Sequence, residues 1–166
     1  MSIAPPLTRI AVGVLVERRR SASPWGGDVW APAGVLSGVP DTADWSPVRE
    51  DGERVTFYAG AAEIELHRSE TASYGDNLLS GAPLLWVVLR AHDGTPPCRV
   101  FAVTADPAEG EAFTLNGDDI VEAVPMPRAI QEAIAAFVAT HHVDRGFIKR
   151  VRDRADPDSM SRGERQ

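Results

Sequence analysis

Three ionisable side chains at alternate positions of one predicted strand form the most enzyme-like group in the sequence. The segment 62–67 places Glu63, Glu65 and His67 on one face, because successive side chains of a strand point to opposite sides. Alternate positions lie about 7 Å apart, so two carboxylates and an imidazole could converge on a divalent ion. Their spacing matches no metal-ligand signature, and the polar outer face of a sheet gives the same alternation. Metal binding by this face therefore stays an alternative, and no metal site is predicted.

Other residues with reactive side chains give no catalytic pattern. The sequence lacks a G-x-S-x-G elbow, a glycine-rich dinucleotide loop and a P-loop. Cys98, the single cysteine, excludes an internal disulfide; a neighbouring cation could lower its pKa, or it is simply a small residue at a strand start. His141 and His142 point about 100° apart on a helix and cannot easily share one ligand. We therefore expect a non-enzymatic protein without a cofactor.

A second group of residues suits binding rather than catalysis. Arg18, Arg19 and Arg20 follow the end of the first predicted strand, and the loop after them contains Trp25. Arginine and tryptophan are enriched at the energetic centres of protein interfaces, and arginine holds carboxylates in two-pronged contacts. Tryptophan more often covers a core, so Trp25, in a loop, is a better interface candidate than Trp30 in the return strand.

The charge of the chain is divided unevenly. Residues 1–144 carry 10 Lys and Arg against 20 Asp and Glu, whereas residues 145–166 carry 7 against 4. An acidic body argues against nucleic-acid binding, and a basic arm suits a partner groove with an acidic rim. The arm could equally lie on the acidic stretch 106–122 of its own chain, and it would bind a membrane surface only marginally. The partner-binding candidates in the arm are Phe147, Lys149, Arg150, Arg152 and Arg154.

Length and composition predict a single domain with a substantial core. The chain has 166 residues, 43% of them hydrophobic, and a net charge of −7. It has no apolar run long enough to span a membrane and no visible secretory signal, so we expect a cytoplasmic location. The predicted organisation is a flexible leader at 1–7, one α+β domain at 8–143, and a basic arm at 144–166 that frays after about 157.

Hydrophobic alternation and turn residues predict the elements that hold these groups. A short helix over 70–80, capped by Ser69 and ended by Gly81, precedes two strong strands, and a helix starts at Asp106. A long amphipathic helix begins near Pro127. Residues 37–48 are expected to form a loop. The predicted strands are 8–16, 29–36, 54–58, 62–67, 84–90 and 99–104. We expect 54–58 and 62–67 to pair around 59–61. Residues 118–124 form either a last strand or an extended segment that leads into the long helix.

This order of elements predicts an α+β fold. We expect an antiparallel sheet sandwich or partly closed barrel of six to seven strands, with the long C-terminal helix covering it. Pro32 places the strand 29–36 at an edge or a bulge, and such an edge could support a homodimer. A pleckstrin-homology-like module has a similar order, and it would use Arg18, Arg19 and Arg20 to read an anionic head group.

Three segments of the sequence resemble a known family. They are IAVGVLVERRRSASPWGGDVWAPAGVL, FYAGAAEIELHRSETASYGDNLLSGAPLLWVVLR and VEAVPMPRAIQEAIAAFVATHHVDRGFIKRVRDRADP. Over residues 8–158 the chain is similar to the bacterial domain-of-unknown-function family 3305 (DUF3305). Members are commonly encoded beside molybdenum-dependent formate dehydrogenase genes. The resemblance therefore implies an accessory role in assembly or regulation of that enzyme, with a subunit or a maturation factor as partner, and it implies no catalytic residue.

Overall fold

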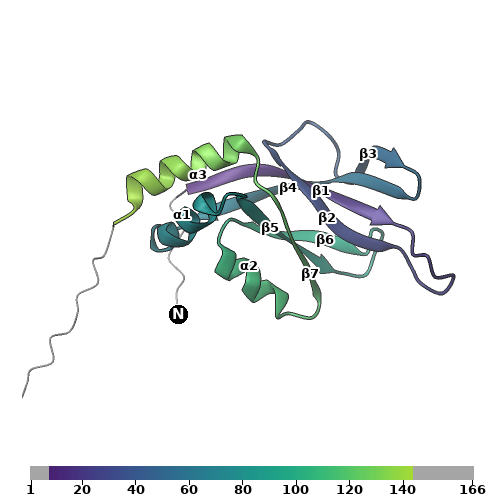
Figure 1. The fold of residues 1–166 in the computed structure, drawn as a ribbon. Coiled ribbons are helices and arrows are strands. Elements are labelled where there is room, and N and C mark those ends of the chain that lie inside the picture. Colours follow the sequence, from purple (N-terminus) through teal and green to yellow (C-terminus); the bar gives the residue numbers. More distant parts are fainter. Residues whose placement is uncertain (1–7, 144–166) are drawn as a thin grey trace, which may run out of the picture.

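The computed structural model describes residues 8–143, which form two antiparallel sheets and three α-helices (Figure 1). A four-stranded sheet has the order β2-β1-β4-β3 and a three-stranded sheet the order β6-β5-β7. The elements are β1 (Thr8–Arg19), β2 (Val29–Ser37), β3 (Ser46–Asp51), β4 (Arg54–Leu66), a 3₁₀ turn (Arg68–Glu70), α1 (Thr71–Leu79), β5 (Leu84–Ala91), β6 (Cys98–Thr104), α2 (Pro107–Thr114), β7 (Asp119–Pro125) and α3 (Arg128–His141).

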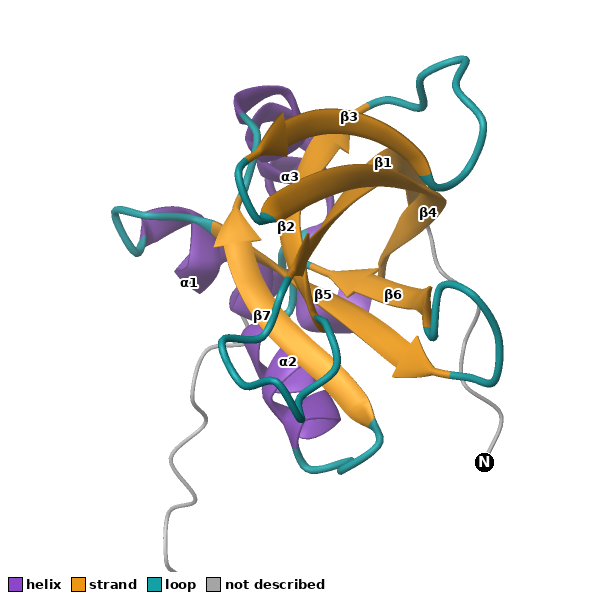
Figure 2. Cartoon of the chain, turned by 90° about the vertical axis from the view of Figure 1, so that its right-hand side faces the viewer, coloured by secondary structure: helices purple, strands orange, loops and turns teal. Residues whose placement is uncertain are grey.

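The core lies between the two sheets, which form opposite walls of the molecule in Figure 2. Val12, Val14 and Val16 alternate along β1 and are fully buried, and so are Leu85 and Val87 of β5. Because side chains of a strand alternate between its faces, each of these runs delivers one apolar face to the same interior. The predicted sandwich of antiparallel strands is therefore confirmed.

The two sheets approach each other at both edges without joining. β2 lies beside β7, and β4 lies beside β6, but no hydrogen-bonded ladder connects the sheets within residues 8–143. The partly closed barrel, which was the second predicted architecture, is therefore not supported. The strands end their pairing before closure, and each sheet keeps its own edges.

The pairing of 54–58 with 62–67 is wrong. These residues form one continuous strand, β4, which pairs with β1 along its whole length. Val14 of β1 faces Gly60, whereas Leu15 faces Tyr58, so Ala59 is an extra residue in a β-bulge. Gly60 has φ +126, a conformation that glycine adopts without steric cost. The glycine therefore marks a bulge and not the turn of a hairpin.

The expectation of a loop over 37–48 is wrong at its end. β3 begins at Ser46 and forms a hairpin with the first half of β4. Every residue of β3 after Ser46 is exposed, so this edge strand carries no alternation of buried and exposed side chains that a sequence pattern would show. The edge position of Pro32 is confirmed, because β2 is an edge strand with a register shift beside it.

The helices follow their predicted boundary signals in part. Asp106 caps α2 by accepting the N–H of Ala108 at 2.9 Å, and Gly81 follows α1 with φ +86, both as predicted. Ser69 is not the cap of α1. It lies in the 3₁₀ turn, and α1 starts after Glu70 without a side-chain cap.

The long C-terminal helix covers only one end of the sheets. The stripe of Ile130, Ile134 and Phe137 is buried in the core, and the Phe137 ring meets the Tyr74 ring of α1 edge-on, with centroids 6.2 Å apart. α3 and α1 lie side by side in Figure 1, and the opposite face of α3 is open to solvent. The helix α3 therefore leaves the rest of the sandwich surface uncovered.

Candidate functional site

An aromatic cluster closes the end of the four-stranded sheet away from the helices. Trp30 of β2 stacks on Phe57 of β4 at 5.8 Å, and Trp45 meets Trp30 edge-on at 5.9 Å. Arg18 lies over this cluster, with its guanidinium carbon 5.3 Å from the Phe57 ring and 5.9 Å from the Trp30 ring. The register explains this, since Arg18 pairs with Trp30 across β1 and β2. The charge of Arg18 is used within the fold, by cation–π contact and by Asp28 at 3.8 Å.

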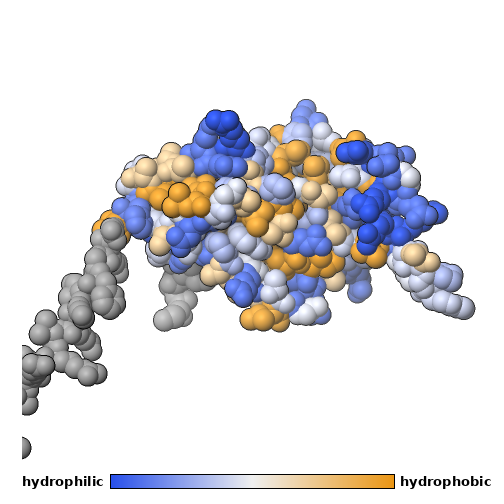
Figure 3. Space-filling view, in the orientation of Figure 1, coloured by the Kyte–Doolittle hydropathy of each residue, from blue (hydrophilic) through white to orange (hydrophobic). Residues whose placement is uncertain are grey.

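The β1–β2 loop holds Trp25 away from the aromatic cluster. The Trp25 side chain is 94% exposed, more than any other large hydrophobic side chain among the described residues. Local hydrogen bonds shape the loop: the Gly26 N–H donates to the Ser23 carbonyl at 3.1 Å, and the Trp25 N–H donates to Ser23 Oγ at 3.3 Å. The loop projects at one end of the molecule (Figure 1), and hydrophilic side chains gather beside it around β3 (Figure 3).

The predicted partner-binding residues divide into three groups. Arg19 and Arg20 are exposed, and the ion pairs found within residues 8–143 do not include them. With Trp25 they form a surface that we call the β1–β2 tip. Arg18 is half-buried and belongs to the aromatic cluster, so the three arginines do not act as one group. The arm candidates Phe147, Lys149, Arg150, Arg152 and Arg154 lie outside the described residues.

The outward face of β4 forms one wall of a groove whose other wall is β6. This β4–β6 groove has a volume of about 260 Å³ and contains all three weak metal candidates. Arg9 of β1 lies 3.5 Å from Glu63 and 3.8 Å from Glu65, and His67 Nε2 lies 3.8 Å from Glu65. The residues lining the groove are Glu63, Glu65, His67, Phe101, Ala102, Val103, Thr104 and Glu109.

Glu109 of α2 adds a third carboxylate that sequence reasoning missed. Although the residue is exposed overall, desolvation raises the pKa of its carboxyl, and the charge of Asp106 raises it further. His67 lowers it in part, and Glu65 acts in the raising direction. Glu109 comes from a distant helix, so no local pattern could have connected it to β4. The groove is a concentrated negative surface.

The three weak metal candidates do not form a ligand set. Within residues 8–143 no three His, Cys, Asp or Glu side chains are placed to hold a metal ion. Glu63 and Glu65 instead form ion pairs with Arg9. The metal alternative therefore has no geometric support in this part of the chain.

The histidines and the cysteine have ordinary positions. His141 stacks near the Phe137 ring at 4.6 Å, whereas the Nδ1 of His142 lies 3.0 Å from Thr71 Oγ1, so the two rings diverge as expected. Cys98 is buried, and burial raises the pKa of its thiol. The idea that a cation lowers the pKa of Cys98 is thus wrong.

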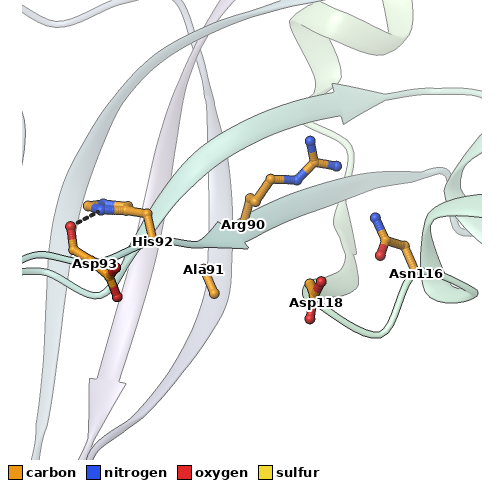
Figure 4. A pocket seen from close by; sticks show the side chains of 6 residues that line it. All are labelled: Arg90, Ala91, His92, Asp93, Asn116 and Asp118. Atoms are coloured by element: carbon orange, nitrogen blue, oxygen red, sulfur yellow. Dashed lines mark hydrogen bonds between the residues drawn. The ribbon is translucent and has the colours of Figure 1, made fainter.

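A wide hollow lies where β5 ends (Figure 4). It measures about 620 Å³ and is lined by Arg90, His92, Asp93, Asn116 and Asp118, with Ala91 between them. The Arg90 guanidinium donates to both Asp119 oxygens at 2.8 and 2.9 Å and lies 3.3 Å from the Phe101 ring centroid. This arginine therefore holds β5, β6 and β7 together and is poorly placed to bind a substrate.

We expect the pair of Arg90 and Asp119 to stabilise the fold in a pH-dependent way. Hydrogen bonds from Arg90 lower the pKa of the Asp119 carboxyl, against the opposing effect of desolvation. The contribution is therefore present above the ordinary carboxyl pKa of about 4 and is lost as pH falls through the lowered value. In urea unfolding between neutral and acidic pH, Asp119→Asn should be less stable at pH 7 and lose less stability on acidification. Asp118→Asn, on the adjacent exposed residue, should follow the wild-type curve.

The described part of the chain is an α+β two-sheet protein with a projecting aromatic loop and an acidic groove. A family model described as "Protein of unknown function (DUF3305)" matches residues 11–152, so the chain belongs to the DUF3305 family. The resemblance inferred from the sequence is confirmed at this level. No curated protein and no solved structure matches the chain. Within residues 8–143 no helix is long and apolar enough to cross a membrane.

Proposed function

We propose that this protein is a non-catalytic accessory protein that binds a partner protein through the β1–β2 tip. The exposure of Trp25 supports this proposal most directly. A buried tryptophan stabilises a fold through its large apolar area and its N–H donor, whereas the exposed Trp25 side chain does not stabilise the free protein in this way. Burying it in a partner pocket would contribute on the order of 2–3 kcal/mol.

Arg19 and Arg20 give the tip its chemical preference. Both are exposed beside the Trp25 loop, and the Arg20 N–H donates to the Glu53 carbonyl at 3.3 Å, which ties this strand end to the β3–β4 turn. Two guanidinium groups around an aromatic anchor suit a pocket with a carboxylate rim. The basic arm 144–166 would add a second cationic contact to the same partner.

The partner that we propose is a subunit or a maturation factor of a molybdenum-dependent formate dehydrogenase. Binding would take place in the cytoplasm. This part of the proposal is supported by the gene neighbourhood that the family resemblance implies. Tagged protein purified from its native cells under formate dehydrogenase expression should retain such a component. Recovery of neither a subunit nor a maturation factor would contradict the proposal.

Trp25→Ala should weaken binding to the recovered partner about 30-fold, since interface tryptophans typically contribute about 2 kcal/mol or more. The variant should unfold at the wild-type urea concentration, because the removed side chain is 94% exposed. Leu79→Ala is the matched control: Leu79 is 87% exposed but lies at the end of α1. Binding can be measured by titration calorimetry. Equal affinities of the two variants for the partner would show that the β1–β2 tip is not part of the interface.

A further inference from the structure

We propose that the β4–β6 groove is the docking site of the chain's own basic arm, so that the arm is held against its domain until a partner competes for it. This inference goes beyond the proposed function, because it concerns the protein alone. It holds whether or not the β1–β2 tip binds formate dehydrogenase components. This occupant is favoured by the charge of the groove, by the strands that line it, and by the point where the described chain ends.

Charge complementarity favours a cationic occupant. Glu63, Glu65 and Glu109 line the groove, and among the described residues only Arg9 and His67 oppose their charge, at 3.5 Å or more. Negative groups so close to each other gain from a cation that enters between them. The raised pKa of Glu109 agrees with this arrangement. Within eleven residues the arm supplies Arg145, Lys149, Arg150, Arg152 and Arg154.

The walls of the groove are two strands without a paired neighbour on this side. Within residues 8–143, β6 pairs only with β5, and β3 pairs with β4 only as far as Tyr58. Because β4 and β6 already lie beside each other, and an inserted strand would need about 4.8 Å on each side, no further strand fits between them. A basic segment would therefore lie over the groove and contact its carboxylates through side chains.

Two side-chain contacts connect the end of the described chain to this groove. His142, directly after α3, contacts Thr71 at the start of α1 through Nδ1 and Oγ1 at 3.0 Å. One helical turn further, the Tyr74 hydroxyl accepts the N–H of His67 at 3.0 Å, and His67 lines the groove. Six extended residues from 144 span up to about 20 Å. A tethered segment has a millimolar effective concentration, which favours it over a second copy.

The structure changes which acids the arm would meet. The sequence suggested the stretch 106–122 as a docking surface. However, Asp106 caps α2 and Asp119 is held by Arg90. Glu109 is the member of that stretch that lines the groove, and β4 supplies the other carboxylates. A surface assembled from two strands and a helix replaces the linear acidic segment.

A unique lysine makes the proposal testable in the full-length protein. Lys149 is the sole lysine of the sequence. A water-soluble carbodiimide joins an amine to a carboxylate only when they are in contact. Treating dilute purified protein and mapping the peptides of the monomer should reveal Lys149 joined to Glu63, Glu65 or Glu109. Cross-linking should be lost near 1 M salt, where the screening length is about 3 Å.

Paired charge reversals in the arm provide the control. Arg150→Glu with Arg152→Glu should lower the groove cross-links about tenfold, because two ion pairs are replaced by repulsion. Arg162→Glu with Arg165→Glu changes the net charge equally and should leave them unchanged. Circular dichroism would check that both variants fold. Cross-links only between two chains, only to carboxylates outside the groove, or equally reduced in both variants would overturn the proposal. Loss of partner binding does not enter this test, so the proposed function can fail independently.

Discussion

Replacing Gly110 with alanine is expected to lower the free energy of unfolding by about 3 kcal/mol. A Cβ at this position of α2 would lie 2.3 Å from Cγ of Trp86 and 2.6 Å from its Cδ1, well inside contact distance. Trp86 belongs to the central strand of the three-stranded sheet and cannot move without displacing its neighbours. Either α2 shifts outward or the indole leaves its rotamer, and overpacking of this kind costs about 1–3 kcal/mol or more.

Gly75→Ala is the matched control for this prediction. Gly75 also lies inside a helix, α1, but the nearest atom to its added Cβ is a Val138 methyl carbon at 4.0 Å. The same substitution should stabilise the protein there by about 0.5–1 kcal/mol, since alanine favours helix over glycine. Urea unfolding with an unchanged slope would measure both effects. Shifts of the same sign would show that the contact with Trp86 does not limit the packing of α2.

The Gly110 variant also bears on the proposed docking of the arm. Glu109 precedes Gly110 on α2 and forms part of the β4–β6 groove. An outward shift of α2 would move Glu109 away from Glu65 and His67. Cross-links from Lys149 to Glu109 should therefore decrease more than those to Glu65. The close packing of Gly110 against Trp86 thus helps to position the Glu109 carboxylate in the groove.

Local signals in the sequence predicted elements well where neighbours in the chain determine them. The cap at Asp106 and the glycine after α1 were correct because each acts within one turn of its helix. The alternation of Glu63, Glu65 and His67 correctly predicted an outward polar face of β4. The continuity of β4 was missed because a glycine in a bulge and a glycine in a turn give the same local pattern.

The candidate sites depend on contacts that no local pattern contains. Glu109 reaches the groove only because β6 lies beside β4 and α2 follows β6. Arg18 differs from Arg19 and Arg20 because it shares a sheet face with Trp30, which requires the register of β1 and β2. A run of three arginines therefore predicted a cationic surface but could not separate the structural one from the exposed two.

Asn77→Ala is expected to destabilise the protein by about 3–5 kcal/mol. Asn77 is one of a few polar residues that are buried within residues 8–143. Its Nδ2 donates to the carbonyls of Leu84 at 2.8 Å and Ala105 at 2.9 Å, and its Oδ1 accepts the N–H of Leu84 at 3.0 Å. One side chain thus joins α1 to the start of β5 and to the connection between β6 and α2. Alanine would leave three backbone groups without this partner, at a cost of about 1–3 kcal/mol each where water cannot replace it.

Asn116→Ala is the matched control, because it removes the same amide side chain from an exposed position. Asn116 is exposed and donates one bond, from Nδ2 to Asp119 at 3.2 Å. Its replacement should cost less than about 1 kcal/mol, because water can take over the bond. Asn77→Ala should also increase hydrogen exchange at the Leu84 amide, which loses its acceptor, while Asn116→Ala should not. Equal unfolding midpoints for the two variants would mean that water enters at Asn77, and that α1 is attached to the sheets by its apolar contacts alone.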